Sequence, residues 1–219
     1  MPVLEAVELT LVRYTKGDHL GYMLAWISLI PVFISLGVFP SHFIFRRELH
    51  GIFFYLGHII SLYLSIFIKN FVKQPRPETC VMLEICHSNG WPSNHAEYTF
   101  FFATYLSLLN YKGINGICNG KLGILMAWCL GFLTMYSRVY LGYHTVEQVK
   151  AGAIFGTIIA GVWFWVVNSF ISHYYPAIEK SRIGKMLYLK DTSHLPNVLK
   201  FEYETAIAAR QTMMNCKGH

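Results

Sequence analysis

Charged residues are scarce in this 219-residue chain, and their scarcity limits what kind of protein it can be. Only 14% of the residues are Asp, Glu, Lys or Arg, whereas soluble domains carry roughly 25%. Hydrophobic residues make up 54% and aromatic residues 16%. So little polar surface cannot cover a globule in water, and lipid is therefore expected to surround much of the chain. The same composition excludes an intrinsically disordered chain and a coiled coil.

Aspartate is almost absent, which excludes several kinds of metal and phosphate chemistry. The two aspartates, Asp18 and Asp191, belong to no cluster of carboxylates. A two-metal phosphatase would lack its ligands, and an aspartyl-phosphate mechanism would lack its nucleophile. The sequence has no glycine-rich nucleotide loop, and no paired Cys or His spacing indicates a zinc site. We therefore expect neither a metal ion nor a cofactor.

Long stretches without Lys, Arg, Asp or Glu dominate the chain and predict membrane helices. Because a helix needs about 20 apolar residues to cross the hydrocarbon core, the short third stretch is expected to extend back to about His95. We predict an all-α, polytopic membrane helical bundle of about five helices. Residues 1–22 would form an N-terminal lumenal segment, 23–175 the membrane domain and 176–219 a cytosolic C-terminal tail. The five stretches are Met23–Phe45, Gly51–Ile68, Tyr98–Tyr111, Leu122–Ser137 and Ala151–Tyr175.

The distribution of Lys and Arg predicts the orientation of the bundle, since short cytosolic loops are enriched in them. Eleven of the eighteen lie between spans one and two, between spans three and four, or in the tail, which we expect to be cytosolic. The other seven lie on the opposite, exoplasmic side, and this rule does not explain their position there. The exoplasmic loop also holds Cys80 and Cys86, which either pair in an oxidising lumen or stay two free thiols.

Three groups of polar residues fall at helix ends on the exoplasmic side, and each has an ordinary structural explanation. Lys69 and Arg138 close spans two and four, where long cationic side chains often reach toward the interface. Ser93 or Asn94 can cap the helix of span three. His144, before span five, can be a satisfied structural histidine. Taken singly, these explanations are sufficient.

Taken together, the three groups predict an anion site. Arg76 lies between two prolines that restrict its backbone, and a planar guanidinium suits phosphate oxygens. The start of span three presents free N–H groups to an anion, and His95 beside it is a suitable proton donor. Such a group of cations and histidines near lipid is costly unless an anion offsets the charge. Without a carboxylate nucleophile, one histidine can attack phosphorus while the other protonates the leaving oxygen, as in a metal-free phosphohydrolase.

The spacing of these residues resembles a known signature. Lys69-x6-Arg76-Pro77, Pro92-Ser93-Asn94-His95 and Ser137-Arg138-x5-His144 resemble the three-part signature of the type 2 phosphatidic acid phosphatase and haloperoxidase superfamily. The resemblance implies a membrane phosphatase whose active site lies at the lumenal membrane interface. The segments FRRELHGI, YSRVYLGYHT and KDTSHLPNVLKFEYE resemble the members that hydrolyse dolichyl diphosphate in the endoplasmic reticulum, and that likeness extends over residues 17–203.

The resemblance also implies a role for each site residue. His144 would be the nucleophile that forms a phosphohistidine, and His95 the acid that protonates the leaving group. The superfamily usually has an aspartate four residues after the nucleophile, whereas this chain has Gln148. Either the Gln148 amide or the neighbouring Glu147 would orient the ring. The phosphate oxygens would be bound by Lys69, Arg76, Ser93, Asn94 and Arg138.

The implied substrate is dolichyl diphosphate, a polyprenyl diphosphate, cleaved in the lumenal leaflet of the endoplasmic reticulum membrane to recycle the glycan carrier for protein N-glycosylation. One alternative is another lipid phosphate, such as phosphatidate or a shorter isoprenyl diphosphate. A second is a non-catalytic lipid-binding membrane protein that kept the basic pocket. Both histidines favour catalysis, since binding needs only the cations. Membrane lipid is an expected partner, and nucleic acid is not.

Overall fold

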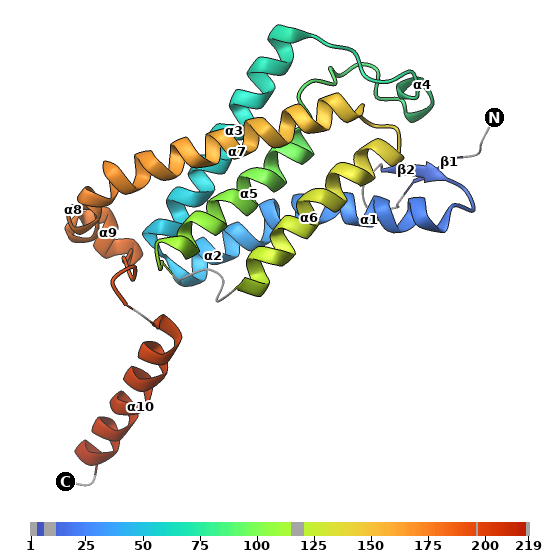
Figure 1. Ribbon diagram of the computed structural model, residues 1–219. Coiled ribbons are helices and arrows are strands. Elements are labelled where there is room, and N and C mark those ends of the chain that lie inside the picture. Colours follow the sequence, from blue (N-terminus) through green and yellow to red (C-terminus); the bar gives the residue numbers. More distant parts are fainter. Residues whose placement is uncertain (1–3, 7–11, 115–120, 196, 218–219) are drawn as a thin grey trace.

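The computed structural model is mostly helical and describes residues 4–6, 12–114, 121–195 and 197–217. Figure 1 shows a bundle of long helices, with the last helix extending away from it toward the C-terminus. The described elements in chain order are β1 (Leu4–Ala6), β2 (Arg13–Thr15), α1 (His19–Phe33), the π-helical turn η1 (Ile34–Val38), α2 (Phe39–Arg46), α3 (Leu49–Val72), α4 (Cys80–Leu83), α5 (Asn94–Tyr111), α6 (Lys121–Tyr140), α7 (Val146–Ser169), the 3-10 turn η2 (Ile171–Tyr174), α8 (Tyr175–Lys180), α9 (Arg182–Leu187) and α10 (Val198–Lys217).

Within the described residues, 4 helical segments are long and apolar enough to cross a membrane, which confirms the predicted helical membrane bundle. α5 is the fifth long helix of the bundle, and its first turn is polar. Because α5 packs against α1, α3, α6 and α7, many of its side chains are buried by protein rather than exposed to lipid. It begins at Asn94, next to the predicted His95. The four apolar segments are His19–Arg46, Leu49–Val72, Lys121–Tyr140 and Val146–Lys180.

The first span begins at His19 rather than at the predicted Met23, because Asp18 caps α1. The Asp18 carboxylate accepts a hydrogen bond from the backbone N–H of Gly21 at 2.9 Å, which satisfies a free donor of the first turn. From there the helix continues through η1 into α2. At the other end of the bundle, α7 stops at Ser169, but the helical segment continues through η2 and α8 to Lys180, beyond the predicted Tyr175.

Small residues let α5 and α7 approach each other closely. Gly152 and Gly156 lie on the buried side of α7, one turn apart. A Cβ atom at either position would collide with a backbone oxygen of α5, that of Ser93 or that of Glu97. Since only glycine fits at both positions, the close packing holds the first turn of α5 against the first turns of α7. This contact positions the site described below.

The outer and inner faces of the bundle differ in the expected way for a protein in lipid. Phe45, Phe67 and Phe71 are 81%, 70% and 82% exposed on the spanning helices, which suits contact with acyl chains. Inside, Phe54 of α3 stacks on Tyr105 of α5 with ring centroids 4.4 Å apart. Offset aromatic stacking of this kind adds about 0.5–1.5 kcal/mol to the burial of the rings.

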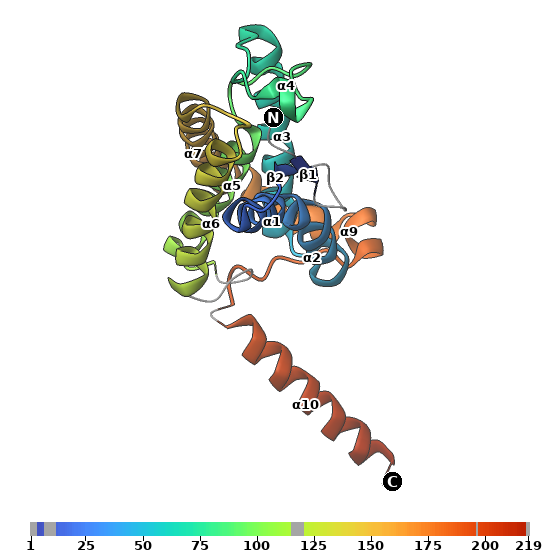
Figure 2. The ribbon, with the colours of Figure 1, turned by 90° about the vertical axis from the view of Figure 1, so that its right-hand side faces the viewer.

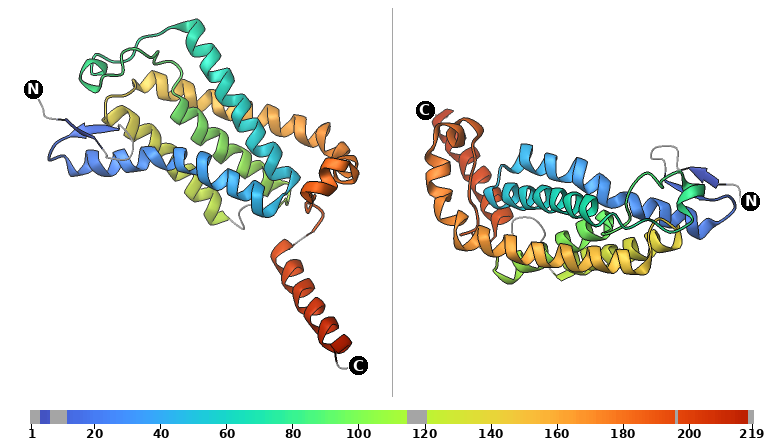
Figure 3. Two further views of the ribbon diagram at one scale, coloured as in Figure 1. Left: turned by 180° about the vertical axis from the view of Figure 1, so that it is seen from behind. Right: turned by 90° about the horizontal axis from the view of Figure 1, so that it is seen from above.

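The loop between α3 and α5 is tied to its neighbours at one end of the bundle. Cys80 and Cys86 form a disulfide, so of the two states that the sequence left open the structure has the paired one. The Thr79 hydroxyl donates a hydrogen bond to the carbonyl of Gly142 at 2.6 Å. The β1–β2 ribbon, which the sequence did not indicate, lies at the same end. Figure 3 shows α8 and α9 at the opposite end.

The C-terminal segment begins at that opposite end. The buried Glu48 carboxylate accepts hydrogen bonds from the backbone N–H and the hydroxyl of Thr192, at 2.7 and 2.8 Å. Arg46 forms an ion pair with Glu202 of α10 at 2.8 Å. Beyond this pair, α10 leaves the bundle, as Figure 2 shows. The two ends of the bundle therefore carry different structures, the ribbon and disulfide loop at one and the tail at the other.

Candidate active site

The three groups of residues predicted from the sequence meet at the end of the bundle that holds the disulfide loop. Lys69 lies in the last turn of α3, and Arg76 follows in the loop. Ser93 occupies the N-cap position of α5 without a side-chain capping hydrogen bond, and Asn94 and His95 begin the helix. Arg138 lies in the last turn of α6, and His144 lies in the connection to α7. The predicted convergence is thus present in the fold.

The buried His144 ring is held on both sides by hydrogen-bonding groups. Its Nδ1 lies 3.2 Å from the Gln148 side-chain oxygen, and its Nε2 lies 3.2 Å from Arg76 Nη1. The Gln148 amide nitrogen donates to the carbonyl of Pro75 at 2.8 Å, so the amide oxygen faces the histidine. Gln148 thus contacts the ring through its oxygen, whereas Glu147 is exposed.

These contacts define which ring nitrogen of His144 carries the proton. A carbonyl oxygen only accepts, so the Pro75 contact fixes the Gln148 amide with its oxygen toward Nδ1. Nδ1 must then be the donor. A guanidinium only donates, so Nε2 must accept from Arg76. Both constraints give one neutral tautomer, with a lone pair on Nε2 directed toward the guanidinium.

Local backbone structure holds Gln148 in this position. Thr145 caps α7, and its hydroxyl accepts from the Gln148 N–H at 3.3 Å while the Gln148 oxygen accepts from the Thr145 N–H at 3.3 Å. This reciprocal pair is a capping box. The Gln148 carbonyl accepts a hydrogen bond from the N–H of Ser93 at 3.1 Å, which joins the start of α5 to α7. At Gly90, a Cβ atom would collide with the Gln148 amide, so glycine leaves room for it.

Arg76 and Arg138 are held in different ways. Arg76 Nε donates to the Ser88 hydroxyl at 2.9 Å, and Nη1 donates to the Tyr143 carbonyl at 2.8 Å. Burial lowers the pKa of Arg76 from its ordinary value. Arg138 is 5% exposed, and its guanidinium carbon lies 3.9 Å from the centre of the Tyr143 ring. Its buried Nε has no hydrogen-bond partner among the described residues.

The site carries an excess of positive charge. In the described part of the chain, Lys69, Arg76 and Arg138 form no ion pair with a carboxylate, and the Ser93 hydroxyl is buried without a partner. Burial is the main reason that the pKa of the His144 ring lies well below its ordinary value, and the charges of Arg138 and Arg76 lower it further. An anion among these groups would offset the charge and supply acceptors for the unused donors.

A carboxylate that the sequence analysis missed lies close enough to Lys69 to interact with its charge. Glu97 is fully buried in the first turn of α5 and accepts a hydrogen bond from the Ser61 hydroxyl of α3. One turn further along α3, the Ser65 hydroxyl donates to the Asn94 side-chain oxygen at 3.3 Å. These two contacts join α3 to α5 through polar groups. An ionisable residue inside a membrane helix is the signal that points to Glu97.

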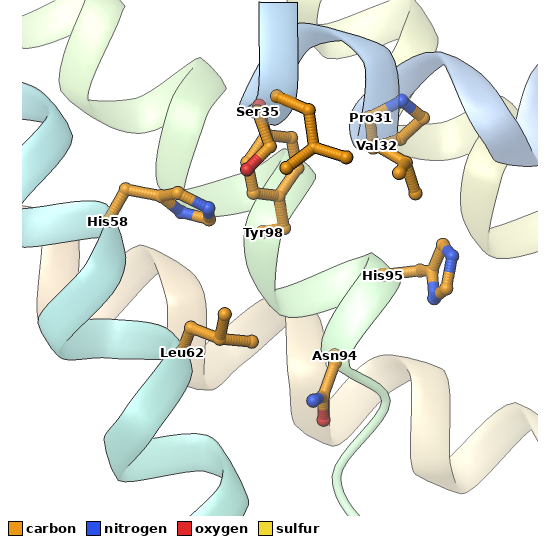
Figure 4. Close-up of a pocket in the computed structure, with 9 residues that line it drawn as sticks. Pro31, Val32, Ser35, His58, Leu62, Asn94, His95 and Tyr98 are labelled. Atoms are coloured by element: carbon orange, nitrogen blue, oxygen red, sulfur yellow. The ribbon is translucent and has the colours of Figure 1, made fainter. Parts of the chain in front are cut away.

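An apolar groove of about 200 Å³ opens beside His95. In Figure 4, His95 and Asn94 lie at one side of it, and His58 and Leu62 of α3 lie at the other. His58 packs edge-on against Tyr98 with ring centroids 4.1 Å apart. The remaining wall comes from the first span, where Pro31 lies inside α1 and the π-helical turn η1 follows. The groove is lined by Pro31, Val32, Ser35, Leu36, His58, Leu62, Asn94, His95 and Tyr98.

The fold and the site together define a multi-pass helical membrane protein with a cationic, histidine-containing site at one end of the bundle. Residues 51–172 match the model of the PAP2 superfamily, and the chain belongs to this family of lipid phosphatases. The family resemblance inferred from the three signature segments is therefore confirmed.

Relatives along nearly the whole chain agree with this assignment. The chain is 58% identical to lipid phosphate phosphatase gamma of Arabidopsis thaliana, with 98% of this chain and 96% of that protein covered. It is 36% identical to dolichyldiphosphatase 1 of Homo sapiens, covering 90% and 86% of the two chains. The crystal structure of Aquifex aeolicus LpxE shares the fold, with a TM-score of 0.51, 23% identity and coverage of 68% of this chain and 87% of that one. The names of the Arabidopsis and human relatives agree on phosphatase chemistry and differ in the substrate that they specify.

Proposed function

We propose that the chain hydrolyses a lipid phosphate without a metal ion, with His144 as the nucleophile. The observation that carries this proposal is the position of the His144 ring, whose Nδ1 lies 3.2 Å from the Gln148 side-chain oxygen and whose Nε2 lies 3.2 Å from Arg76 Nη1. A neutral ring with its proton on Nδ1 can attack phosphorus while the guanidinium binds a phosphate oxygen. Orientation of the nucleophile by a second group is the usual arrangement in covalent catalysis.

The first step transfers the phosphoryl group to the enzyme. Nε2 of His144 forms a bond to phosphorus, and the bond from phosphorus to the leaving oxygen breaks. The electron pair stays on that oxygen, which takes a proton from the His95 imidazolium, a form that the negative charge of the bound lipid phosphate favours. Charge on the three equatorial oxygens is stabilised by Lys69, Arg76 and Arg138, together with Ser93 and Asn94 at the start of α5.

The second step releases phosphate. Water attacks the phosphorus of the phosphohistidine and gives a proton to His95, while the bond from phosphorus to Nε2 breaks. Inorganic phosphate leaves, and both histidines return to their starting states. The same residue thus acts first as acid and then as base, as microscopic reversibility permits.

For the substrate, we propose dolichyl diphosphate, which would lose its terminal phosphate and leave dolichyl phosphate. Dolichyldiphosphatases of several organisms align over most of this chain, such as the human protein and the yeast protein at 36% and 32% identity. The apolar groove beside His95 suits a hydrocarbon chain rather than a soluble phosphate ester. The 58% identity to a protein named lipid phosphate phosphatase gamma favours a second candidate, a broader lipid phosphate such as phosphatidate.

We further propose that the protein resides in the endoplasmic reticulum membrane with the site facing the lumen. The excess of Lys and Arg in the predicted cytosolic loops and tail supports this orientation. A disulfide between Cys80 and Cys86, on the loop beside the site, suits an oxidising compartment.

One experiment tests activity and substrate together. Purified protein is assayed in one detergent on dolichyl diphosphate, dolichyl phosphate and phosphatidate, with His144→Ala as the matched inactive control. Phosphate release that is much faster from dolichyl diphosphate supports the first substrate, and comparable rates on phosphatidate support the second. Absence of release from every lipid, or equal release by the His144→Ala variant, would overturn the proposed function.

A further inference from the structure

Tyr143 contacts both arginines of the site, each through a different part of the residue. Its ring faces the guanidinium of Arg138, with 3.9 Å between the guanidinium carbon and the ring centroid. Its carbonyl accepts a hydrogen bond from Arg76 Nη1 at 2.8 Å. Its side chain is 5% exposed. Tyr143, the residue before the proposed nucleophile, therefore contacts both Arg138 and Arg76.

The contact with the ring leaves the hydrogen-bond donors of Arg138 free. A guanidinium bound to a carboxylate would use its N–H groups in that pair, whereas stacking on an aromatic face uses none of them. Among the described residues, no carboxylate pairs with Arg138 and its Nε has no partner. The guanidinium is thus restrained in position while its donors stay available for phosphate oxygens.

The Tyr143 ring is itself fixed from outside the site. Its hydroxyl accepts a hydrogen bond from the backbone N–H of Arg13 in β2 at 2.8 Å. The Arg13 side chain pairs with Glu84 of the disulfide loop at 2.5 Å. These contacts join the N-terminal ribbon, the loop and the ring, so the ring cannot turn away from Arg138 without breaking the hydroxyl contact.

We infer that Tyr143 is a positioning residue that holds Arg138 and Arg76 in the geometry that binds the transferred phosphoryl group. The inference rests on the proposed phosphatase function and adds to it a residue outside the signature. The ring acts on Arg138, the carbonyl acts on Arg76, and the hydroxyl links both to the ribbon. Because the carbonyl belongs to the backbone, side-chain substitution tests the ring and the hydroxyl separately.

The test measures binding of orthovanadate, a phosphate analogue that adopts a trigonal-bipyramidal geometry, as well as turnover. Tyr143→Leu removes the ring and should weaken vanadate binding about ten-fold, within the range of a desolvated cation–π contact, and lower kcat/KM by a similar factor. Tyr143→Phe keeps the ring and should stay within about three-fold of the wild type. Tyr136→Leu, at a tyrosine that is 52% exposed on the same helix as Arg138, is the matched control.

A double-mutant cycle separates positioning from a general structural effect. In an Arg138→Ala background, Tyr143→Leu should weaken vanadate binding less than about two-fold, because the guanidinium that the ring restrains is gone. An equal loss in both backgrounds would overturn the inference. If Tyr143→Leu does not fold, Tyr143→Trp retains an aromatic face and should bind vanadate like Tyr143→Phe, and a ten-fold loss there would also overturn it.

The same experiment distinguishes this inference from the proposed function. A wild-type protein that binds vanadate but releases no phosphate from any lipid contradicts the proposed function, and the effect of Tyr143→Leu on binding still tests the positioning role. A wild-type protein that hydrolyses lipid phosphate, with Tyr143→Leu unchanged in binding and turnover, overturns the inference alone. Failure of the wild type to bind vanadate or inorganic phosphate overturns both.

Discussion

Replacing Gln148 by alanine should lower turnover while leaving substrate affinity nearly unchanged. The substitution removes the acceptor that lies 3.2 Å from His144 Nδ1 and the donor that lies 2.8 Å from the Pro75 carbonyl. A buried hydrogen bond contributes roughly 0.5–1.5 kcal/mol, and leaving a buried partner unsatisfied costs about 1–3 kcal/mol. If this loss raises the activation free energy by about 1–3 kcal/mol, kcat falls roughly 5- to 150-fold. KM should change less than about three-fold, since Gln148 contacts neither the guanidinium groups nor the groove.

The assay is steady-state phosphate release by purified protein in detergent, with Glu147→Ala as the matched control. Glu147 is the adjacent residue of the same helical turn, but it is exposed, and the hydrogen bond to His144 Nδ1 is made by Gln148. Its variant should retain turnover within about two-fold of the wild type, as surface substitutions usually do. A fully active Gln148→Ala enzyme together with a crippled Glu147→Ala enzyme would refute the reasoning and assign the orienting role to Glu147.

A charged replacement tests the same contact through pH. The pKa of His144 lies below its ordinary value, first because of burial and then because of nearby positive charge. The neutral ring is the nucleophile, so activity should persist below the ordinary histidine pKa of about 6.5 and fall only as the ring protonates. In Gln148→Asp, a carboxylate would stabilise the imidazolium and raise that pKa. The acidic limb of kcat/KM should therefore move to higher pH, and an unchanged limb would mean that the carboxylate does not reach the ring.

Three further predictions concern metal, the acid and topology. Excess EDTA should leave activity intact, because the described residues hold no cluster of carboxylates that could bind a metal ion, and loss of activity that magnesium restores would contradict this. His95→Ala should lose roughly 10²- to 10⁴-fold in turnover and regain much of it on an activated ester with a good leaving group, whereas His144→Ala should stay inactive. Equal rescue of both variants would mean that the roles are wrongly assigned. A glycosylation acceptor introduced near Glu84 should be modified in microsomes and one near Asp191 should not, and the reverse pattern would invert the proposed orientation.

Much of the fold follows from the sequence because its determinants are local. Runs without charge are long enough to identify the spans, and the position of α5 follows from the Pro-Ser-Asn-His segment that precedes it. The ends of the spans are less predictable, since a cap such as Asp18 adds a turn that hydropathy does not register. The β1–β2 ribbon could not be predicted from the sequence for a different reason. Its strands have three residues each, too few for an alternating pattern to be recognised.

The contacts of the site were harder to predict because they join residues far apart in the chain. Spacing places Gln148 one turn after His144, and Thr145-x-x-Gln148 has the pattern of a capping box, so the sequence held a signal for choosing it over Glu147. The carbonyl that fixes the amide belongs to Pro75, in another loop, and no local pattern reports it. Tyr143 was missed likewise, because its importance comes from stacking on Arg138.

The use of an amide rather than a carboxylate beside His144 is consistent with the charge of the site. Arg76 and Arg138 favour a neutral imidazole, and a neutral imidazole is the form that can attack phosphorus. A carboxylate at position 148 would oppose these cations and favour protonation of the ring before attack. The Gln148 amide supplies the same acceptor without charge, so it fixes the tautomer and leaves the lone pair on Nε2. On this reasoning the cations keep the nucleophile neutral as well as binding the phosphate, and charge and tautomer are set by separate residues.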